Sequence, residues 1–106
     1  MAQTCGWAVG PTETIDFEVF DKNDGWAEQP GLYIFACQQG DDWRALYIGQ
    51  ADSLAARLPQ HERLPEAIDR GATHIHARVV PQKDRRDRWE QALISMHQPP
   101  LNSRHR

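Results

Sequence analysis

The spacing of apolar and polar residues predicts three strands in the first half of the chain. Residues 14–20 alternate apolar with mostly acidic side chains, which is the pattern of a half-buried strand. Two apolar runs, 32–37 and 45–48, flank the short glycine-containing segment 39–42, and this arrangement predicts a β-hairpin. Residues 1–13 show neither pattern, so we expect them to be poorly ordered or loosely packed.

Helix signals follow the hairpin. Ser53 can cap a helix that begins near Leu54. A second, short helix is expected to begin at Pro65 and to stop at Gly71, because proline favours the first helical position and glycine the position just past the end. Residues 73–80 are rich in β-branched side chains and predict a further strand.

The strongest helical pattern covers residues 84–98. One apolar stripe at helical spacing supports it, formed by Trp89, Ala92, Leu93 and Met96. The resulting order of elements predicts an α+β fold with a small, mostly antiparallel sheet of three to four strands flanked by helices. We divide the chain into an N-terminal extension with one strand, residues 1–30, and a main domain, residues 31–106.

The hairpin brings two tyrosines together. If it is symmetric about Gly40, Tyr33 lies directly opposite Tyr47 on one face of the sheet, with Cβ atoms about 4.5–5.5 Å apart. Such a pair is equally compatible with ordinary core packing. Arg57 and His61 are four residues apart, so a continuous helix places them on one face near the two phenols. An Arg/His pair of this kind is also common on solvated surfaces.

Length and composition are those of one ordinary globular domain. The 106 residues are 40% hydrophobic and 25% charged, enough for one modest core. No apolar run approaches the roughly 20 residues of a membrane span, and residues 1–10 lack the pattern of a secretory signal. Cys5 and Cys37 are too few for a disulfide framework or a zinc site. We therefore expect a cytoplasmic protein in a reducing environment, with no membrane partner.

The net charge of −3 argues mildly against a nucleic-acid partner, but the charges are unevenly distributed. Residues 1–53 hold nine acidic and two basic residues, whereas residues 54–106 hold six acidic and ten basic residues. The second half can therefore face a polyanion while the first half faces away. This distribution permits nucleic-acid binding without establishing it.

A set of short motifs resembles the core of the GIY-YIG nuclease family. The set spans Gly31 to Asn102, about two-thirds of the chain, and its members stand in the order found in the family. They are Gly31-Leu32-Tyr33, Tyr47-Ile48-Gly49, Leu54 with Arg57 and His61, Glu90 with Leu93-Ile94, and Pro100-Leu101-Asn102. Each tripeptide alone is weak, but all of them in order are hard to produce by chance.

The resemblance implies hydrolysis of a nucleic-acid phosphodiester bond, with DNA as the expected substrate and RNA left open. It implies that Tyr33 is the general base or activates water, and that Tyr47 hydrogen-bonds the scissile phosphate or a water held by the metal. Arg57 is expected to bind the phosphate, and His61 to orient Tyr33 or accept its proton. Glu90 is expected to bind one divalent cation, Mg²⁺ or Mn²⁺. Because a phenol has a pKa of about 10, Tyr33 needs neighbouring cations to act near neutrality.

Other residues are expected to support this chemistry. Asn102 is expected to tether the segment after the last helix or to orient a ligand, and Gly49 to support the site from its strand. A basic group at the start of the last helix can contact phosphate backbone, or can equally be a solvated helix start: Lys83, Arg85, Arg86 and Arg88. The basic tail, residues 104–106, has the same two interpretations.

One departure from the motif leaves alternatives open. Pro59 stands between Arg57 and His61, and a proline inside a helix costs about 3 kcal/mol and breaks or kinks it. If the helix ends before it, His61 is expected to miss Tyr33.

The alternatives to an active endonuclease are a nucleic-acid-binding module with weak or no cleavage and a protein-interaction module that keeps the fold. A recruiting protein or a homodimer is a further expected partner.

Overall fold

The computed structural model describes residues 3–21 and 25–102. The basic tail, 104–106, lies wholly outside these residues. No helix in the described part of the chain is both long enough and apolar enough to cross a membrane.

Within the described residues, five strands form one antiparallel sheet in the order β1-β2-β5-β3-β4. Their bounds are β1 Thr4–Ala8, β2 Thr14–Asp21, β3 Gly31–Gln39, β4 Asp42–Ala51 and β5 His74–Val79. The α+β class and the antiparallel sheet are confirmed, with one strand more than expected. That strand is β1, in the segment expected to be loosely packed. It forms because it pairs with β2 along its whole length and because Trp7 is buried, at 4% exposure.

Four helical segments complete the part of the fold that the structure describes: α1 (Leu54–Arg57), the 3₁₀ turn η1 (Leu58–Gln60), α2 (Leu64–Asp69) and α3 (Lys83–His97). The hydroxyl of Ser53 accepts a hydrogen bond from the amide of Ala56, as its position in the sequence predicts. In α2, Pro65 lies in the first turn, and Gly71 follows the end with a φ of +108°.

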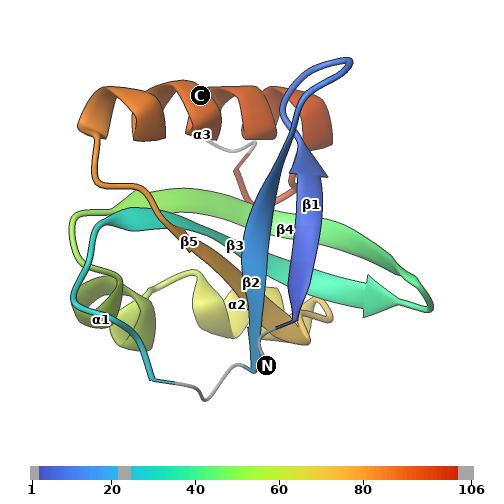
Figure 1. Cartoon of the computed structure of the whole chain (residues 1–106). Helices are drawn as coiled ribbons and strands as arrows, with labels where there is room; N and C mark the ends of the chain where they lie inside the picture. Colours follow the sequence, from blue (N-terminus) through green and yellow to red (C-terminus); the bar gives the residue numbers. More distant parts are fainter. Residues whose placement is uncertain (1–2, 22–24, 103–106) are drawn as a thin grey trace.

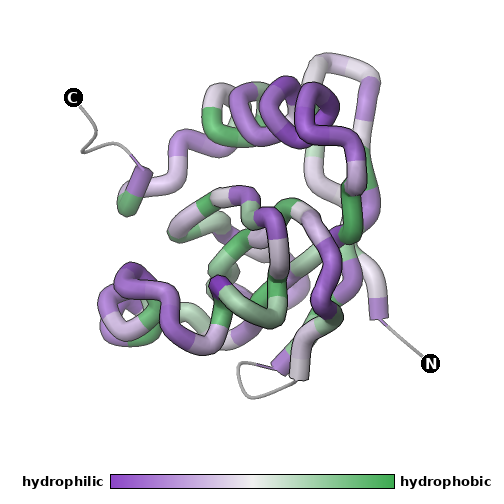
Figure 2. Tube along the Cα trace, turned by 90° about the vertical axis from the view of Figure 1, so that its left-hand side faces the viewer, coloured by the Kyte–Doolittle hydropathy of each residue, from purple (hydrophilic) through white to green (hydrophobic). Residues whose placement is uncertain are grey.

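The helices cover the two faces of the sheet separately (Figure 1). On one face, Leu54 and Leu58 of the α1–η1 segment pack with Tyr33 and Phe35 of β3. On the other face, Leu93 of α3 packs with residues of β3 and β4. Figure 2 shows the hydrophobic stretches toward the inside of the trace and the hydrophilic ones mostly on its outer turns. The expected stripe on α3 is only partly buried, because the side chain of Met96 is 46% exposed.

The hairpin register differs from the symmetric one. A two-residue turn, Gly40-Asp41, joins the strands, and a bulge next to Phe35 shifts the register further. Tyr33 therefore pairs with Gly49, and Tyr47 pairs with Phe35, so the expectation of direct opposition is wrong. Both phenols still lie on one face of the sheet, because the two shifts together amount to an even number of residues. Their ring centroids are 6.3 Å apart, with 27° between the ring planes.

His76 is a titratable side chain buried in the core on the α3 side of the sheet. It has no exposed surface, and its Nδ1 accepts a hydrogen bond from Nε1 of Trp7 at 2.9 Å. The ring of Trp43 lies 4.4 Å away. Burial, with a smaller contribution from His74, lowers the pKa of His76 from 6.5 to about 4. His76 is therefore neutral at pH 7, and protonation at Nδ1 would break its bond to Trp7.

This histidine makes the fold sensitive to mild acid. Below pH 6.5 the unfolded chain binds a proton that folded His76 binds only near pH 4, so stability falls as the pH is lowered through this window. His76 can account for at most roughly 3 kcal/mol of this loss. Urea unfolding at several pH values between about 7.5 and 4.5 measures the loss. We expect a shallower pH dependence for His76→Gln, which can accept from Trp7 without titrating. An unchanged slope in the variant would assign the acid sensitivity to other groups.

Candidate active site

Tyr33 of β3 and His61, the residue after η1, meet at the centre of the site. The helix does end before Pro59, as its position predicts, and the proline lies in the first turn of η1. His61 then adopts an extended backbone, with φ −69° and ψ 125°. Its Nε2 lies 2.8 Å from Oη of Tyr33, and its side chain is only 3% exposed. The helix break therefore brings His61 to Tyr33, and the expectation that it would carry His61 away is wrong.

The hydrogen bonds of His61 determine which nitrogen carries its proton. Nδ1 accepts a hydrogen bond from the backbone amide of Arg63 at 3.0 Å, so Nδ1 is unprotonated. Burial and the nearby positive charge of Arg57 lower the pKa of His61 from 6.5 to about 4. The ring is therefore neutral, with its proton on Nε2, and it donates that proton to Oη of Tyr33. Of the two expected roles, this arrangement suits orienting Tyr33, because a nitrogen that already donates cannot accept the phenol's proton.

The two glycines of the paired motifs are required by close contacts. The ring of Tyr33 lies over Gly49, where an added Cβ atom would come within 2.5 Å of Oη and 2.6 Å of Cζ. At Gly31, an added Cβ atom would collide with the carbonyl oxygen of Arg78 on β5. Gly49 therefore gives the phenol its place on the sheet, and Gly31 lets β3 and β5 approach.

Arg57 ends α1 near the phenols and forms an ion pair with Glu62. Nη1 and Nη2 of Arg57 donate to the two carboxylate oxygens of Glu62 at 2.8 and 3.0 Å. The side chains are 39% and 68% exposed, so solvent weakens this pair. A hydrogen bond from Arg57 lowers the pKa of Glu62 to about 2. The carboxylate occupies the two-pronged geometry in which a guanidinium binds a phosphate.

Both phenols hold their protons in this structure. Burial is the main cause that raises the pKa of Tyr33, and the neighbouring Tyr47 and Glu90 add to it. Burial and Glu90 also raise the pKa of Tyr47. Arg57 lowers the pKa of each phenol but does not offset these causes, and His61 is neutral. The expected cationic field around Tyr33 is therefore incomplete in the protein alone.

Glu90 of α3 is close enough to both phenols to affect their pKa values. The residue is half-buried, and its Oε1 accepts a hydrogen bond from Nε2 of Gln50 at 2.8 Å. None of the ion pairs formed among the described residues includes Glu90. A half-buried carboxylate without a cationic partner fits a divalent cation that keeps most of its waters. The same part of the chain contains no cluster of three or more His, Cys, Asp or Glu side chains that could hold a metal by itself.

Asn102 ties the segment after α3 to the outer edge of β4. Its Oδ1 accepts from the amide of Ile48 at 2.8 Å, and its Nδ2 donates to the carbonyl of the same residue at 2.9 Å. The amide of Leu101 also donates to the carbonyl of Leu46. These bonds occupy β4 on both sides of Tyr47 and hold the segment after α3 against it, which corresponds to the first of the two roles expected of Asn102.

The basic residues of α3 do not share one environment. Arg86 is 3% exposed, and its guanidinium donates to the carbonyls of residues 80 and 81 and to the side chains of Gln50 and Asp52. The expectation that it contacts phosphate backbone is therefore wrong, because these partners hold it inside the fold. Lys83, Arg85 and Arg88 are exposed. Lys83 pairs with Asp87, and the guanidinium of Arg85 lies over the ring of Trp89.

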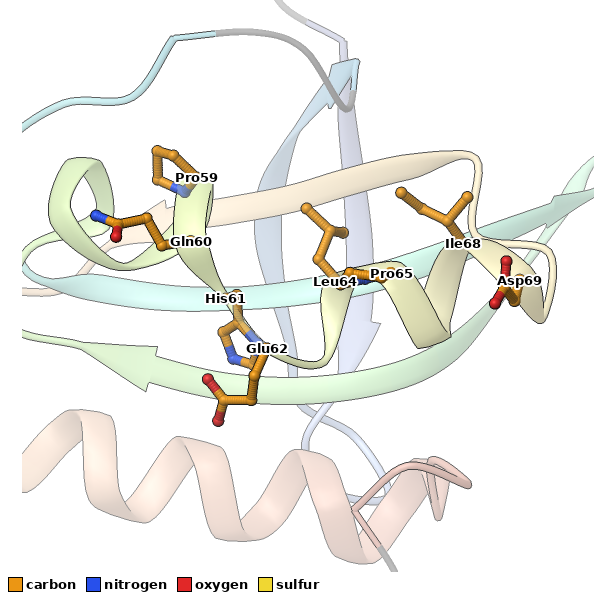
Figure 3. Close-up of a pocket in the computed structure, with 8 residues that line it drawn as sticks. All are labelled: Pro59, Gln60, His61, Glu62, Leu64, Pro65, Ile68 and Asp69. Atoms are coloured by element: carbon orange, nitrogen blue, oxygen red, sulfur yellow. The ribbon is translucent and has the colours of Figure 1, made fainter.

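The segment that carries His61 also borders an open pocket (Figure 3). Figure 3 shows the side chains of His61 and Glu62 on one side of this segment and those of Leu64 and Ile68 on the other. The lining of this pocket does not include Tyr33. The pocket therefore adjoins the site from the side of α2.

Sequence reasoning missed two polar residues that the structure brings to the site, Gln50 and Glu62. Gln50 directly follows Gly49, but an isolated glutamine on a strand carries no signal of its role. Glu62 is five residues after Arg57, a spacing that becomes a contact only because η1 interrupts the helix. Only the fold could identify either residue.

The chain is similar to known proteins over most of its length, although no protein-family model matches it. It is 32% identical to UvrABC system protein C of Haloarcula marismortui, over 82% of this chain and 16% of that protein. The chain thus spans about a sixth of that curated relative.

Solved structures of the GIY-YIG N-terminal endonuclease domain of UvrC from Thermotoga maritima share the fold. In one, a tyrosine-to-phenylalanine variant bound to its catalytic divalent cation, the identity is 30% and the TM-score 0.59, covering 74% of this chain and 88% of that chain. Another, an asparagine-to-alanine variant also bound to its catalytic divalent cation, is 29% identical with a TM-score of 0.56, covering 71% and 83%.

The contact between Tyr33 and Gly49 predicts that an added methyl group lowers the free energy of unfolding at position 49 but not at position 10. We expect Gly49→Ala to displace the phenol ring and to lower the free energy of unfolding by about 1–3 kcal/mol, as overpacking does. Gly10→Ala is the matched control, because an added Cβ atom there meets nothing within 4 Å. Urea unfolding of both variants checks this. Equal effects at the two positions would contradict the close packing of the ring.

Proposed function

This chain belongs to the GIY-YIG endonuclease domain family, and from that premise we propose that it is a metal-dependent endonuclease that hydrolyses phosphodiester bonds of DNA. The observation that carries the proposal is the contact between Oη of Tyr33 and Nε2 of His61, 2.8 Å apart, beside a second phenol. Arg57 and Glu90 bring one positive and one negative charge to the same phenols.

Each of these side chains has a role in the proposed hydrolysis. Ionised Tyr33 takes the proton of a water molecule as that water attacks phosphorus, while the N–H of His61 holds the phenolate oxygen. The bond from phosphorus to the leaving oxygen breaks, and that oxygen takes a proton from solvent. Arg57 binds the phosphate oxygens and balances their extra charge. Tyr47 donates a hydrogen bond to the phosphate.

Glu90 is the proposed ligand of the divalent cation, Mg²⁺ or Mn²⁺. Its Oε1 is engaged by Gln50, and Oε2 has no partner among the described residues. A bound divalent cation supplies positive charge against the phosphate as negative charge develops. A cation bound to the carboxylate of Glu90 would offset the effect by which this carboxylate raises the pKa of both phenols.

The proposed substrate is DNA, in line with the family, and RNA is the competing substrate in the test. The exposed basic side chains on α3, Lys83, Arg85 and Arg88, are proposed to contact phosphate backbone without reading sequence. The basic, C-terminal half of the chain holds all the proposed catalytic residues except the two tyrosines. We further propose that the protein acts in the cytoplasm, with Cys5 and Cys37 as free thiols.

Recruitment by a partner is part of the proposal. The chain corresponds to 16% of UvrABC system protein C, so the activities of that whole protein are not transferred to it. We propose that a recruiting protein or a second copy of the chain contributes to the selection of the target.

A second candidate function is nucleic-acid binding with weak or no cleavage. It is favoured by the raised pKa of Tyr33, by the 2% exposure of this side chain, and by the pairing of Arg57 with Glu62. In this state the site binds the scissile phosphate poorly and ionises its base rarely, whereas the exposed Lys83, Arg85 and Arg88 still offer contacts to the phosphate backbone. Cleavage assays separate the two candidates.

Nicking of supercoiled plasmid DNA and of branched DNA with Mg²⁺ tests the proposed function, with an RNA of matched sequence in parallel. We expect Tyr33→Phe to lower the rate by about 10²–10⁴-fold, the contribution of a general base, and Glu90→Gln to abolish the metal-dependent rate. Glu28→Gln makes the same charge change at an exposed position and is expected to leave the rate unchanged. Equal rates for all four proteins would falsify the proposal. Salt-sensitive binding without cleavage would support the second candidate.

The ion pair between Arg57 and Glu62 predicts a gain of function. The carboxylate of Glu62 occupies the two guanidinium donors of Arg57 that a phosphate would use. Glu62→Gln is therefore expected to tighten DNA binding severalfold. Glu66→Gln is the matched control, since it makes the same charge change beside Arg63 and leaves Arg57 paired. Fluorescence anisotropy with a labelled duplex measures both affinities. If the two variants tighten binding equally, the effect is one of net charge, and Glu62 does not compete with phosphate.

A further inference from the structure

Gln50 lies at the centre of a hydrogen-bond network that joins β4 to α3. Its Nε2 donates to Oδ1 of Asp87 at 2.7 Å and to Oε1 of Glu90 at 2.8 Å. Its Oε1 accepts from Nε of Arg86 at 3.1 Å. Asp87 and Glu90 are three residues apart on α3, so they lie on neighbouring turns of one helix face.

The chemistry of the partners fixes the orientation of the Gln50 amide. A guanidinium only donates hydrogen bonds, so the atom facing Arg86 is the amide oxygen. The NH₂ group must then face the two carboxylates, and each of its hydrogens has one acceptor. The amide cannot flip without placing its oxygen against two carboxylates and its NH₂ against a cation.

Arg86 in turn holds Gln50 in place. Its side chain is 4% exposed, and Nη1 donates to the carbonyls of residues 80 and 81 at the end of β5. Nη2 donates to Asp52, just after β4. Such a buried guanidinium, held by four hydrogen bonds, is a rigid support, because moving it would leave an unpaired charge in the protein.

The two carboxylates on Gln50 differ in one respect. Asp87 also receives a charged hydrogen bond from Nζ of Lys83 at 2.7 Å, and this bond and the one from Gln50 lower its pKa. Glu90 forms no ion pair within the described part of the chain. Of the two, Glu90 is the one whose charge is left to be compensated by a cation from solution.

We propose that Gln50, supported by Arg86, is a positioning residue that holds the carboxylate of Glu90 in place for the divalent cation. The inference rests on the proposed function, because it assumes that Glu90 binds the cation. Gln50 engages Oε1 and thereby restricts the rotation of the carboxylate, which leaves Oε2 available to a cation. A partner that orients a ligating carboxylate in this way typically accounts for about 10–100-fold in metal affinity.

Binding of Mn²⁺, followed by the electron paramagnetic resonance signal of the free ion, tests the positioning role without any cleavage. We expect Gln50→Met, which keeps the length of the side chain but removes its donors, to weaken Mn²⁺ binding by about 10-fold or more. Gln50→Asn, one methylene shorter, is expected to fall between this variant and the wild type. Gln91→Met is the matched control, being the same substitution at an exposed position next to Glu90. Glu90→Gln defines the loss of the site itself.

A second readout separates positioning from a general loss of structure. Gln50→Met is expected to raise the Mg²⁺ concentration needed for half-maximal nicking and to recover most of kcat at saturating Mg²⁺. Thermal unfolding of each variant shows whether α3 stays docked, and Gln50→Asn serves if Gln50→Met does not fold.

The outcomes distinguish the two proposals. If Glu90→Gln abolishes Mn²⁺ binding while Gln50→Met and Gln50→Asn bind like Gln91→Met, the positioning role is overturned and the metal site stands. If Glu90→Gln binds Mn²⁺ as the wild type does, Glu90 is not the ligand, and the proposed function fails together with the inference. Graded weakening by the two Gln50 variants, with full loss in Glu90→Gln, supports both.

Discussion

The ring of Tyr33 lies against the backbone of Gly49, and the geometry of the site follows from this contact. Any side chain at position 49 would occupy the space of the phenol oxygen. With the ring held there, Oη points to where the segment after η1 can deliver His61. Tyr47 then lies diagonally across the same face, close enough for the two rings to stack. The absence of a Cβ atom at Gly49 thus allows the observed arrangement of Tyr33, His61 and Tyr47.

In the protein alone, the charges around this contact do not favour a bound phosphate. Burial and Glu90 keep the phenols protonated, and Arg57 is engaged by Glu62. In the proposed cleavage complex, a divalent cation would compensate Glu90, and the scissile phosphate would take the place of Glu62 at Arg57. The side chains of the site are arranged in the protein alone, and on this proposal the metal and the nucleic acid would complete its electrostatics.

Much of the fold and part of the site were predictable from the sequence, because they depend on local signals. Ser53, Pro65 and Gly71 mark helix ends through short-range backbone chemistry, and the structure uses each of them as predicted. The same holds for the existence of the hairpin, though not for its register. By contrast, β1 carries little periodicity, and it forms because β2 offers a partner strand. The bulge next to Phe35 also has no local signature.

By itself, the sequence determined which residue types are present, their order along the chain and the faces on which the strands place them. That was enough to pair the two tyrosines on one face, and the resemblance of the motifs to the GIY-YIG family associated them with Arg57 and Glu90. Only the tertiary structure decided the exact partners: Gly49 opposite Tyr33, Arg86 buried, and Gln50 bridging β4 to α3. The physical reason is that register, burial and hydrogen-bond orientation depend on contacts between segments far apart in the chain, which local patterns do not encode.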